Sequence, residues 1–241
     1  MNDIIEFNNK SNILTRNQTQ GLELELVNRF INYKKNKFEK YNKNKDISMA
    51  IFEELKIESS YPDIIFVEYN KKNFDNWNEN RKKLNNQDLK ILYHIYMKNG
   101  ISNSQLKRQL GINESTILET ITRLLDAKMI ERNNKLWKIC DRKNFFAITK
   151  IETVEAKINQ WNSALTQAIN NLRFSSECYV LSNTKQEPNN VIRNKFDNLG
   201  IGMYQEKNKN FNLIMKARRN KIPNSYSSLV IEEIIGKEIC I

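Results

Sequence analysis

Residues 151–168 read IETVEAKINQWNSALTQA, and this stretch decides the fold. Its first part alternates, so Glu155 and Lys157 leave one face of a strand while the apolar residues beside them leave the other. From Trp161 onward the apolar residues follow helical spacing instead. A core strand followed at once by an amphipathic helix is typical of an α/β protein. Buried charge is costly unless it is paired or metal-bound, so this pair indicates a functional site. A surface ion pair on an edge strand is the alternative interpretation.

The segments on both sides of this stretch predict an α/β fold with one mixed sheet flanked by helices. Strands are predicted at 49–55, 64–67, 145–158, 178–183, 200–205 and 211–216, and helices at 19–30, 159–174 and 189–199. The Lys/Asn-rich stretch that ends at Lys45 is expected to be a solvated connection. The polar segment 68–83 is expected to be a linker. The tail from Pro223 carries no clear signal.

Residues 84–139 have a different organisation, with three helical runs followed by a hairpin. Asn85 or Asn86 and then Ser102 can cap the first two helices, and Gly111 ends the second. The third run, NESTILETITRLLDAKMI, leads into ERNNKLWKI, two short strands around an Asn-Asn turn. This order resembles the winged helix-turn-helix family.

The winged-helix resemblance implies contacts with DNA. The third helix of such a module enters the major groove and the wing lies along the phosphates. The exposed start of this helix would present Ser115 and Thr116 to the bases. The phosphate contacts would come from Lys107, Arg108, Arg123, Lys135 and Lys138. Winged helices also dock proteins, so an adaptor is an open alternative.

A second resemblance rests on residues outside this module. Asp63 opens PDIIFVE, Glu155-Ala156-Lys157 lies in the core strand, and Gln167 lies in the helix that follows. This order resembles the PD-(D/E)xK nuclease superfamily, in its restriction-endonuclease-like and Holliday-junction-resolvase-like branch. The implied fold is a restriction-endonuclease-like mixed sheet with an inserted winged helix-turn-helix. On this basis, residues 1–83 and 141–241 are the two parts of a nuclease-like domain, and residues 84–140 are the insertion.

The nuclease resemblance also implies a metal site. Asp63 and Glu155 would bind Mg²⁺ or Mn²⁺, together with the carbonyl of Ala156, and Lys157 would orient or deprotonate the attacking water. Gln167 would lie near the metal. An acidic residue of the first helix, Glu25 or Glu23, would complete the site. The family often has a tyrosine four residues after the glutamine, where this chain has Asn171.

Composition agrees with a nucleic-acid partner and excludes several enzyme classes. The 241-residue chain has a formal net charge of +11, which favours polyanions. Its single histidine, His94, lies within a helical run, so Ser-His and Cys-His nucleophile systems are excluded. Three scattered cysteines, Cys140, Cys178 and Cys240, are expected to be neutral thiols in a reducing compartment. We expect a cytoplasmic protein with no membrane span, for which a homodimer is one compatible state.

Two functions of different classes follow from these observations. The leading hypothesis is a divalent-metal-dependent DNA endonuclease that hydrolyses phosphodiester bonds and binds DNA through its winged helix. The alternative is a DNA-binding transcriptional regulator that keeps the nuclease scaffold without turnover. The recognised DNA, the cleavage pattern and the pathway do not follow from the sequence.

Overall fold

The chain forms two units, each built from two separate segments. The computed structural model describes residues 4–7, 15, 20–159 and 161–240. The first unit comprises Met1–Tyr69 and Ile148–Asn224, and the second comprises Asn70–Ala147 and Ser225–Ile241. The second unit therefore includes residues 70–83 and the C-terminal segment besides the segment 84–140 expected from the sequence.

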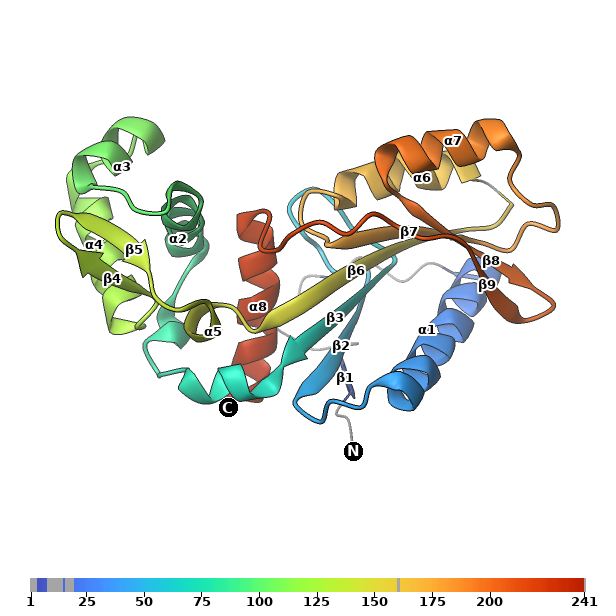
Figure 1. Ribbon diagram of the computed structural model, residues 1–241, viewed down its shortest axis with the longest axis horizontal. Helices are drawn as coiled ribbons and strands as arrows, with labels where there is room; N and C mark the ends of the chain where they lie inside the picture. The colour runs from blue at the N-terminus through green and yellow to red at the C-terminus, as the bar shows by residue number, and fades with distance from the viewer. Residues whose placement is uncertain (1–3, 8–14, 16–19, 160, 241) are drawn as a thin grey trace. The chain divides into compact units, whose positions relative to one another are not determined.

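A mixed sheet forms the centre of the first unit (Figure 1). Its described strands, in spatial order, are β1 (Ile4–Glu6), β2 (Ile47–Glu53), β3 (Ile64–Asn70), β6 (Ile148–Lys157), β7 (Glu177–Ser182), β8 (Gly202–Lys207) and β9 (Asn210–Met215). Strand β6 runs antiparallel to β3 and parallel to β7, and β8 is parallel to β7 but antiparallel to β9. The expected mixed sheet flanked by helices is confirmed at this level.

Helices cover both faces of this sheet. Helix α1 (Leu22–Tyr41) lies on one face, and α6 (Trp161–Asn171) and α7 (Asn190–Leu199) lie on the other (Figure 1). On the α1 face, the Phe30 side chain packs among Phe66, Val154 and Ala156. On the opposite face, Trp161 contributes to a second apolar cluster. Burial of these apolar side chains is the main force that holds the layers together.

Helix α1 is longer than the sequence predicted. The expected connection up to Lys45 is wrong over most of its length because the helix continues to Tyr41. Lys34 and Lys35 in this stretch form ion pairs with Glu152 and Glu6, so a lysine-rich helical face has specific partners on the sheet. The predicted first residue of this helix, Thr19, lies outside the described residues.

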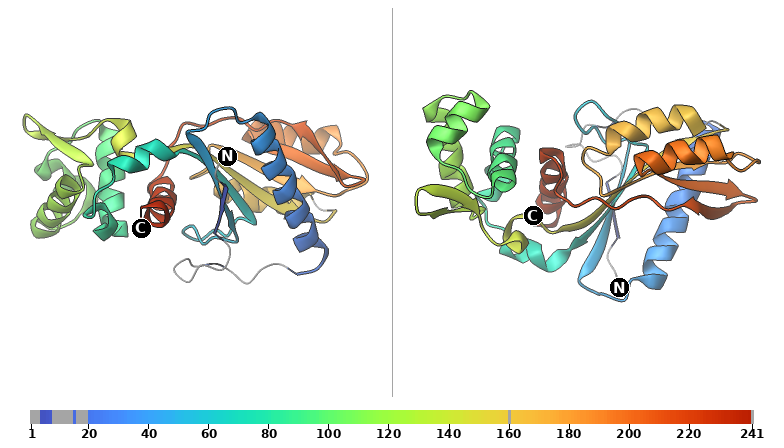
Figure 2. Two further views of the ribbon diagram at one scale, coloured as in Figure 1. Left: turned by 90° about the horizontal axis from the view of Figure 1, so that it is seen from below. Right: turned by 45° about the horizontal axis from the view of Figure 1, so that its top comes forward.

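The second unit contains the predicted helices and hairpin. Its elements are the 3-10 helices η1 (Lys71–Asn76) and η2 (Arg81–Lys83), α2 (Asn86–Lys98), α3 (Asn103–Leu110), α4 (Glu114–Asp126), β4 (Ile130–Asn133), β5 (Leu136–Ile139), α5 (Arg142–Phe145) and α8 (Tyr226–Ile239). Asn85 and Ser102 cap α2 and α3, each through a capping box, and Gly111 ends α3 in the left-handed conformation. Within this unit the C-terminal helix α8 packs beside α2 (Figure 2).

The predicted linker 68–83 is wrong, because this segment is part of β3 and of the core of the second unit. Arg81 in η2 is 1% exposed, and its Nε donates to Glu233 of α8 at 3.0 Å. Its other nitrogens donate to the carbonyls of Asn144 and Phe145, and its guanidinium lies 3.7 Å from the centre of the Trp77 ring. The polar composition of this segment predicted a linker because the partners that bury Arg81 lie far away in the sequence.

The cysteines and the histidine have no visible catalytic arrangement. Cys140, Cys178 and Cys240 are free thiols, and burial raises the pKa of Cys178 to about 12. The Nε2 atom of His94 is hydrogen-bonded to Gln109 at 2.8 Å. Among the described helices, none has both the length and the apolar character needed to cross a membrane.

A buried carboxylate, Glu152, lies on the α1 side of β6 and is ionised. Its side chain is 2% exposed and pairs with Lys34 at 2.5 Å and Lys150 at 2.7 Å. Burial opposes its ionisation, but the two ammonium charges outweigh burial and lower its pKa to about 2. A pKa that is lower in the folded than in the unfolded chain stabilises the fold above the unfolded value.

We therefore predict a pH-dependent difference between the wild type and Glu152→Gln. The variant should be less stable at pH 7, and the difference should shrink as the pH falls below about 4.5 toward about 2, where protonated glutamate becomes equivalent to glutamine. Urea unfolding of both proteins across this range measures it. A difference that stays constant between pH 7 and pH 3 would contradict the assignment.

Candidate functional site

Two acidic residues from distant parts of the sequence meet on neighbouring strands. The register of β3 against β6 pairs Ile64 with Val154, so Asp63, one residue before Ile64, lies opposite Glu155. Both side chains are buried, at 4% and 2% exposure. The backbone N–H of Ala156 donates to Asp63 Oδ2 at 2.7 Å, which fixes the aspartate against β6. The structure thus brings together the acidic pair on which the predicted metal site depends.

Asn171 is a member of this site whose role the sequence did not predict. It is fully buried at the end of α6, and its Nδ2 donates to Glu155 Oε1 at 2.6 Å. Its Oδ1 accepts a hydrogen bond from Ser60 at 2.6 Å, which orients the amide. The sequence indicates only that this position departs from the tyrosine found in the resembled family. Its helical spacing on the buried face of α6 was the available signal.

The two carboxyl groups disfavour each other's ionisation. Burial raises the pKa of Asp63 to about 6, although the Ala156 N–H and Lys157 act in the opposite direction. Burial and then the charge of Asp63 raise the pKa of Glu155 well above its usual range. Two adjacent buried carboxylates are stabilised by a proton or by a cation between them. The pair therefore has the electrostatic character of a cation site.

Lys157 lies at the end of β6 and remains protonated. Its ammonium pairs with Glu23 of α1 at 2.6 Å, and both side chains are about one fifth exposed. Burial opposes the charged form, but the hydrogen bond to Glu23 and the charge of Asp63 outweigh it and raise the pKa of Lys157. A raised pKa makes a lysine a poor proton acceptor at neutral pH, which favours an orienting role over a basic one.

The other predicted site residues lie farther out. Gln167 is exposed on α6. Glu25 has a 65% exposed side chain and pairs with Arg29 at 3.5 Å, while Arg29 also binds Glu206. Of the two alternatives on the first helix, Glu23 is the one that contacts Lys157. A helix turns by about 100° per residue, so Glu25 points along a different direction from Glu23.

The donor set fits a hard divalent cation only if other ligands complete it. In the described part of the chain, no group of three or more His, Cys, Asp or Glu side chains is arranged to hold a metal. Asp63 and Glu155 supply two carboxylates. Mg²⁺ is commonly held by one or two carboxylates, with water and substrate phosphate as the remaining ligands. The two buried oxygen donors satisfy this requirement.

The winged helix presents its cations from α3 and the wing. Lys107, Arg108 and Lys135 are exposed, as a phosphate-binding role requires. At the start of α4, Asn113 accepts hydrogen bonds from the Thr116 N–H and the Ser115 hydroxyl.

The structure gives Arg123 a different partner from the phosphate contact expected of it. Its guanidinium binds the fully buried Asp88 of α2 through several hydrogen bonds, the shortest 2.8 Å. This contact raises its pKa and directs the side chain into the module. Arg123 is the only basic residue of α4, whose exposed face carries Glu114, Glu119 and Asp126. The exposed cations predicted to contact phosphate that remain after this correction lie on α3 and in the wing.

Comparison with known families agrees with this description. A family model described as the MarR family matches residues 84–135, which span α2, α3, α4 and the first wing strand. The comparisons with curated proteins and with solved structures gave no match. The match covers a minority of the chain and identifies a winged helix-turn-helix domain in the second unit.

Proposed function

We propose that the protein binds duplex DNA through its winged helix. The observation that carries this proposal is the MarR family match over α2 to β4. The exposed cations of α3 and the wing, together with a formal net charge of +11, support it further. The short, neutral Ser115 and the N-terminal turn of α4 can approach base edges, while Lys107 and Lys135 contact the phosphates.

Salt dependence tests the phosphate contacts. Lys107→Ala and Lys135→Ala should each weaken duplex binding on all sequences and reduce the slope of log K against log salt by about 1. Lys90→Ala is the matched control, because this exposed lysine of α2 lies 5.2 Å from the Tyr226 ring of α8 and not on α3 or the wing. Fluorescence anisotropy at several salt concentrations gives both quantities. Unchanged slopes in both variants would exclude this mode of binding.

We further propose that Asp63 and Glu155 form a site for metal-dependent hydrolysis of DNA. The supporting observation is their buried pairing across β3 and β6, next to the charged Lys157. A bound Mg²⁺ or Mn²⁺ would polarise a phosphodiester and lower the pKa of a water molecule. The expected carbonyl ligand from Ala156 is part of this proposal.

The protein residues then have separate roles. Asp63 and Glu155 hold the cation, and Asn171 positions the Glu155 carboxylate through its 2.6 Å hydrogen bond. Lys157 attracts and orients a phosphate oxygen or a water molecule, and Glu23 positions the ammonium group. A group that stays protonated contributes through its charge, so the water must lose its proton to another acceptor.

A regulator without turnover is the second candidate, and the MarR family match favours it. Metal titration separates the two functions. The nuclease proposal requires calorimetric binding of Mn²⁺ that is lost in Asp63→Asn, and nicking of DNA with Mn²⁺ or Mg²⁺. Tight duplex binding that is unaffected by Asp63→Asn, with no Mn²⁺ binding, would establish the regulator instead.

A further inference from the structure

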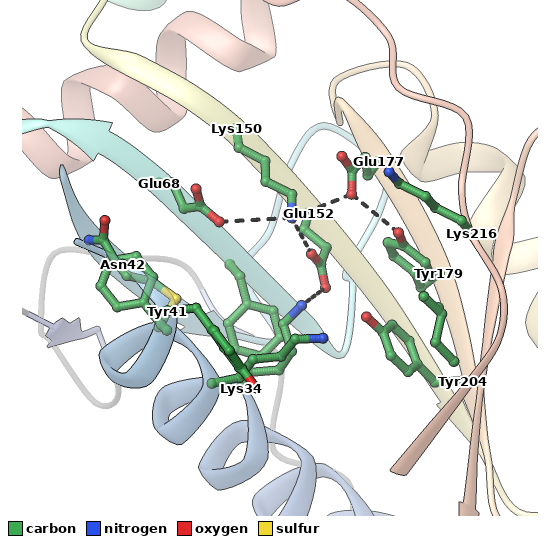
Figure 3. Close-up of a pocket in the computed structure, with 15 residues that line it drawn as sticks. Lys34, Tyr41, Asn42, Glu68, Lys150, Glu152, Glu177, Tyr179, Tyr204 and Lys216 are labelled. Atoms are coloured by element: carbon green, nitrogen blue, oxygen red, sulfur yellow. Dashed lines mark hydrogen bonds and ion pairs between the residues drawn. The ribbon is translucent and has the colours of Figure 1, made fainter. Parts of the chain in front are cut away.

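A pocket separate from the acidic pair lies on the α1 face of the first unit. It has a volume of about 500 Å³, within the range of small-molecule sites. The C-terminal half of α1 forms one wall, and β3, β6, β7 and β8 contribute residues of the sheet that faces it (Figure 3). The functions proposed above do not use this pocket.

Charged groups line the deep part of the pocket. Lys150 lies among three carboxylates, at 2.7 Å from Glu152, 3.4 Å from Glu177 and 3.8 Å from Glu68 (Figure 3). The Glu152 and Glu177 side chains are only 2% and 7% exposed. Hydrophobic residues of similar volume often stabilise a fold as well as a buried ion pair does. A charged network is therefore not required here for stability alone. Beside a cavity, its carboxylates can accept hydrogen bonds from a ligand and its ammonium group can donate them.

Aromatic rings form the sides of the pocket. The Tyr179 and Tyr204 rings are 4.9 Å apart, and both line the cavity together with Phe66. Tyr41, which is 65% exposed, lines it from the last turn of α1. Flat aromatic walls favour a planar ligand because stacking adds to the burial of apolar area.

Two exposed lysines also line the pocket. Lys37 on α1 and Lys216 after β9 are exposed residues of the pocket. Within the described residues neither forms an ion pair, although Lys37 lies 5.7 Å from the Tyr33 ring. Uncompensated ammonium groups at the opening of a pocket attract an anionic group on the ligand.

We propose that this pocket binds a nucleotide, with the base against the Tyr179 and Tyr204 rings and its phosphate at Lys37 and Lys216. A nucleobase edge carries both N–H donors and carbonyl or ring-nitrogen acceptors, which match the carboxylates and the ammonium of Lys150. A plain aromatic carboxylate would leave these polar groups facing C–H bonds. The ligand is either a free nucleotide or one unpaired nucleotide of a strand, since both offer the same chemistry.

Calorimetry with the full-length protein tests this proposal. Nucleoside 5′-monophosphates are the probes, and benzoate and inorganic phosphate are the comparison ligands, each at concentrations up to about 1 mM. A monophosphate of at least one base should bind, and benzoate and phosphate should bind at least about tenfold more weakly. No heat from any nucleotide, or benzoate binding as tightly, would overturn the proposal.

Substitutions locate the binding. Lys37→Ala and Lys216→Ala should each weaken nucleotide affinity about tenfold, because each removes a charged contact with the phosphate. Lys195→Ala, which removes an exposed helical lysine from α7, is the matched control and should bind as the wild type does. Equal affinities in all three variants would place the nucleotide elsewhere and overturn the assignment.

Displacement experiments distinguish the two sources of the nucleotide. If the pocket takes a strand, a short single-stranded oligodeoxynucleotide should displace the monophosphate, and the same oligomer made entirely of abasic units should not. If the ligand is free, neither oligomer should displace it. Displacement by both oligomers alike would overturn the role of the base. None of these measurements depends on cleavage, so they stand apart from the nuclease proposal.

Discussion

Glu155→Gln is expected to lower metal-dependent cleavage of DNA by about 100-fold or more while duplex affinity changes little. The substitution keeps the shape of the side chain, and its Oε1 can still accept the hydrogen bond from Asn171. It removes one of the two carboxylate charges that hold the cation. Single-turnover cleavage with Mn²⁺ and anisotropy measurements on the same duplex give the two quantities.

Stability measurements show whether Glu155→Gln loses activity because it unfolds. Glu155 is buried beside Asp63, whose charge disfavours a second carboxylate. A neutral amide removes this repulsion, so Glu155→Gln should unfold at the same or a higher urea concentration than the wild type. Glu25→Gln is the control, because Glu25 is exposed and pairs with Arg29. Full cleavage activity of Glu155→Gln would disprove the catalytic proposal.

Arg81→Ala is expected to destabilise the second unit by about 3–5 kcal/mol. The arginine neutralises Glu233 and Glu232 of α8 at 3.0 Å and 3.5 Å, where all three side chains are buried. Burial already raises the pKa of Glu233 against the effect of Arg81. Without the arginine, the two carboxyl groups would lose their buried cation, and the charge of Lys237 acts on Glu233 more weakly than that of Arg81. Urea unfolding followed by circular dichroism measures the loss.

The neighbouring Lys82 provides the comparison. Its side chain is 31% exposed and pairs with the exposed Glu79, so Lys82→Ala should cost less than about 1 kcal/mol. A similar small loss in Arg81→Ala would mean that the network contributes little. In that case the segment 70–83 would owe its order to apolar contacts such as Phe74 with Trp77.

Local patterns predicted much of this structure. Alternation around Glu155 predicted β6, and the change of period at Trp161 predicted α6. The caps Asn85 and Ser102 and the terminal Gly111 predicted the limits of α2 and α3. In each case the signal lies within one or two turns of chain, where backbone geometry and side-chain spacing determine the outcome.

Long-range pairing could not be predicted in the same way. The inward direction of Arg123 depends on Asp88, a buried residue on another helix. In the part of α1 that the sequence did not predict, Lys34 and Lys35 have acidic partners on strands that are distant in the sequence. The part played by Asn171 depends on the end of α6 lying beside Glu155. A single sequence gives the residue types at these positions but not which of them meet.

The second unit interrupts the sequence of the first. This limits how either unit can be replaced by a unit from another protein. The chain leaves β3 and returns into β6 at adjacent points, since the Asn70 N–H donates to the Ala147 carbonyl at 3.0 Å. A foreign module with closely spaced ends would fit this opening. However, Glu232 of α8 accepts a hydrogen bond from the Ala147 N–H, so the last helix belongs to the module as well. A recombination event that replaced only residues 70–147 would leave the apolar helix α8 without its packing partners. A chimaera that folds must therefore receive residues 70–147 and α8 together.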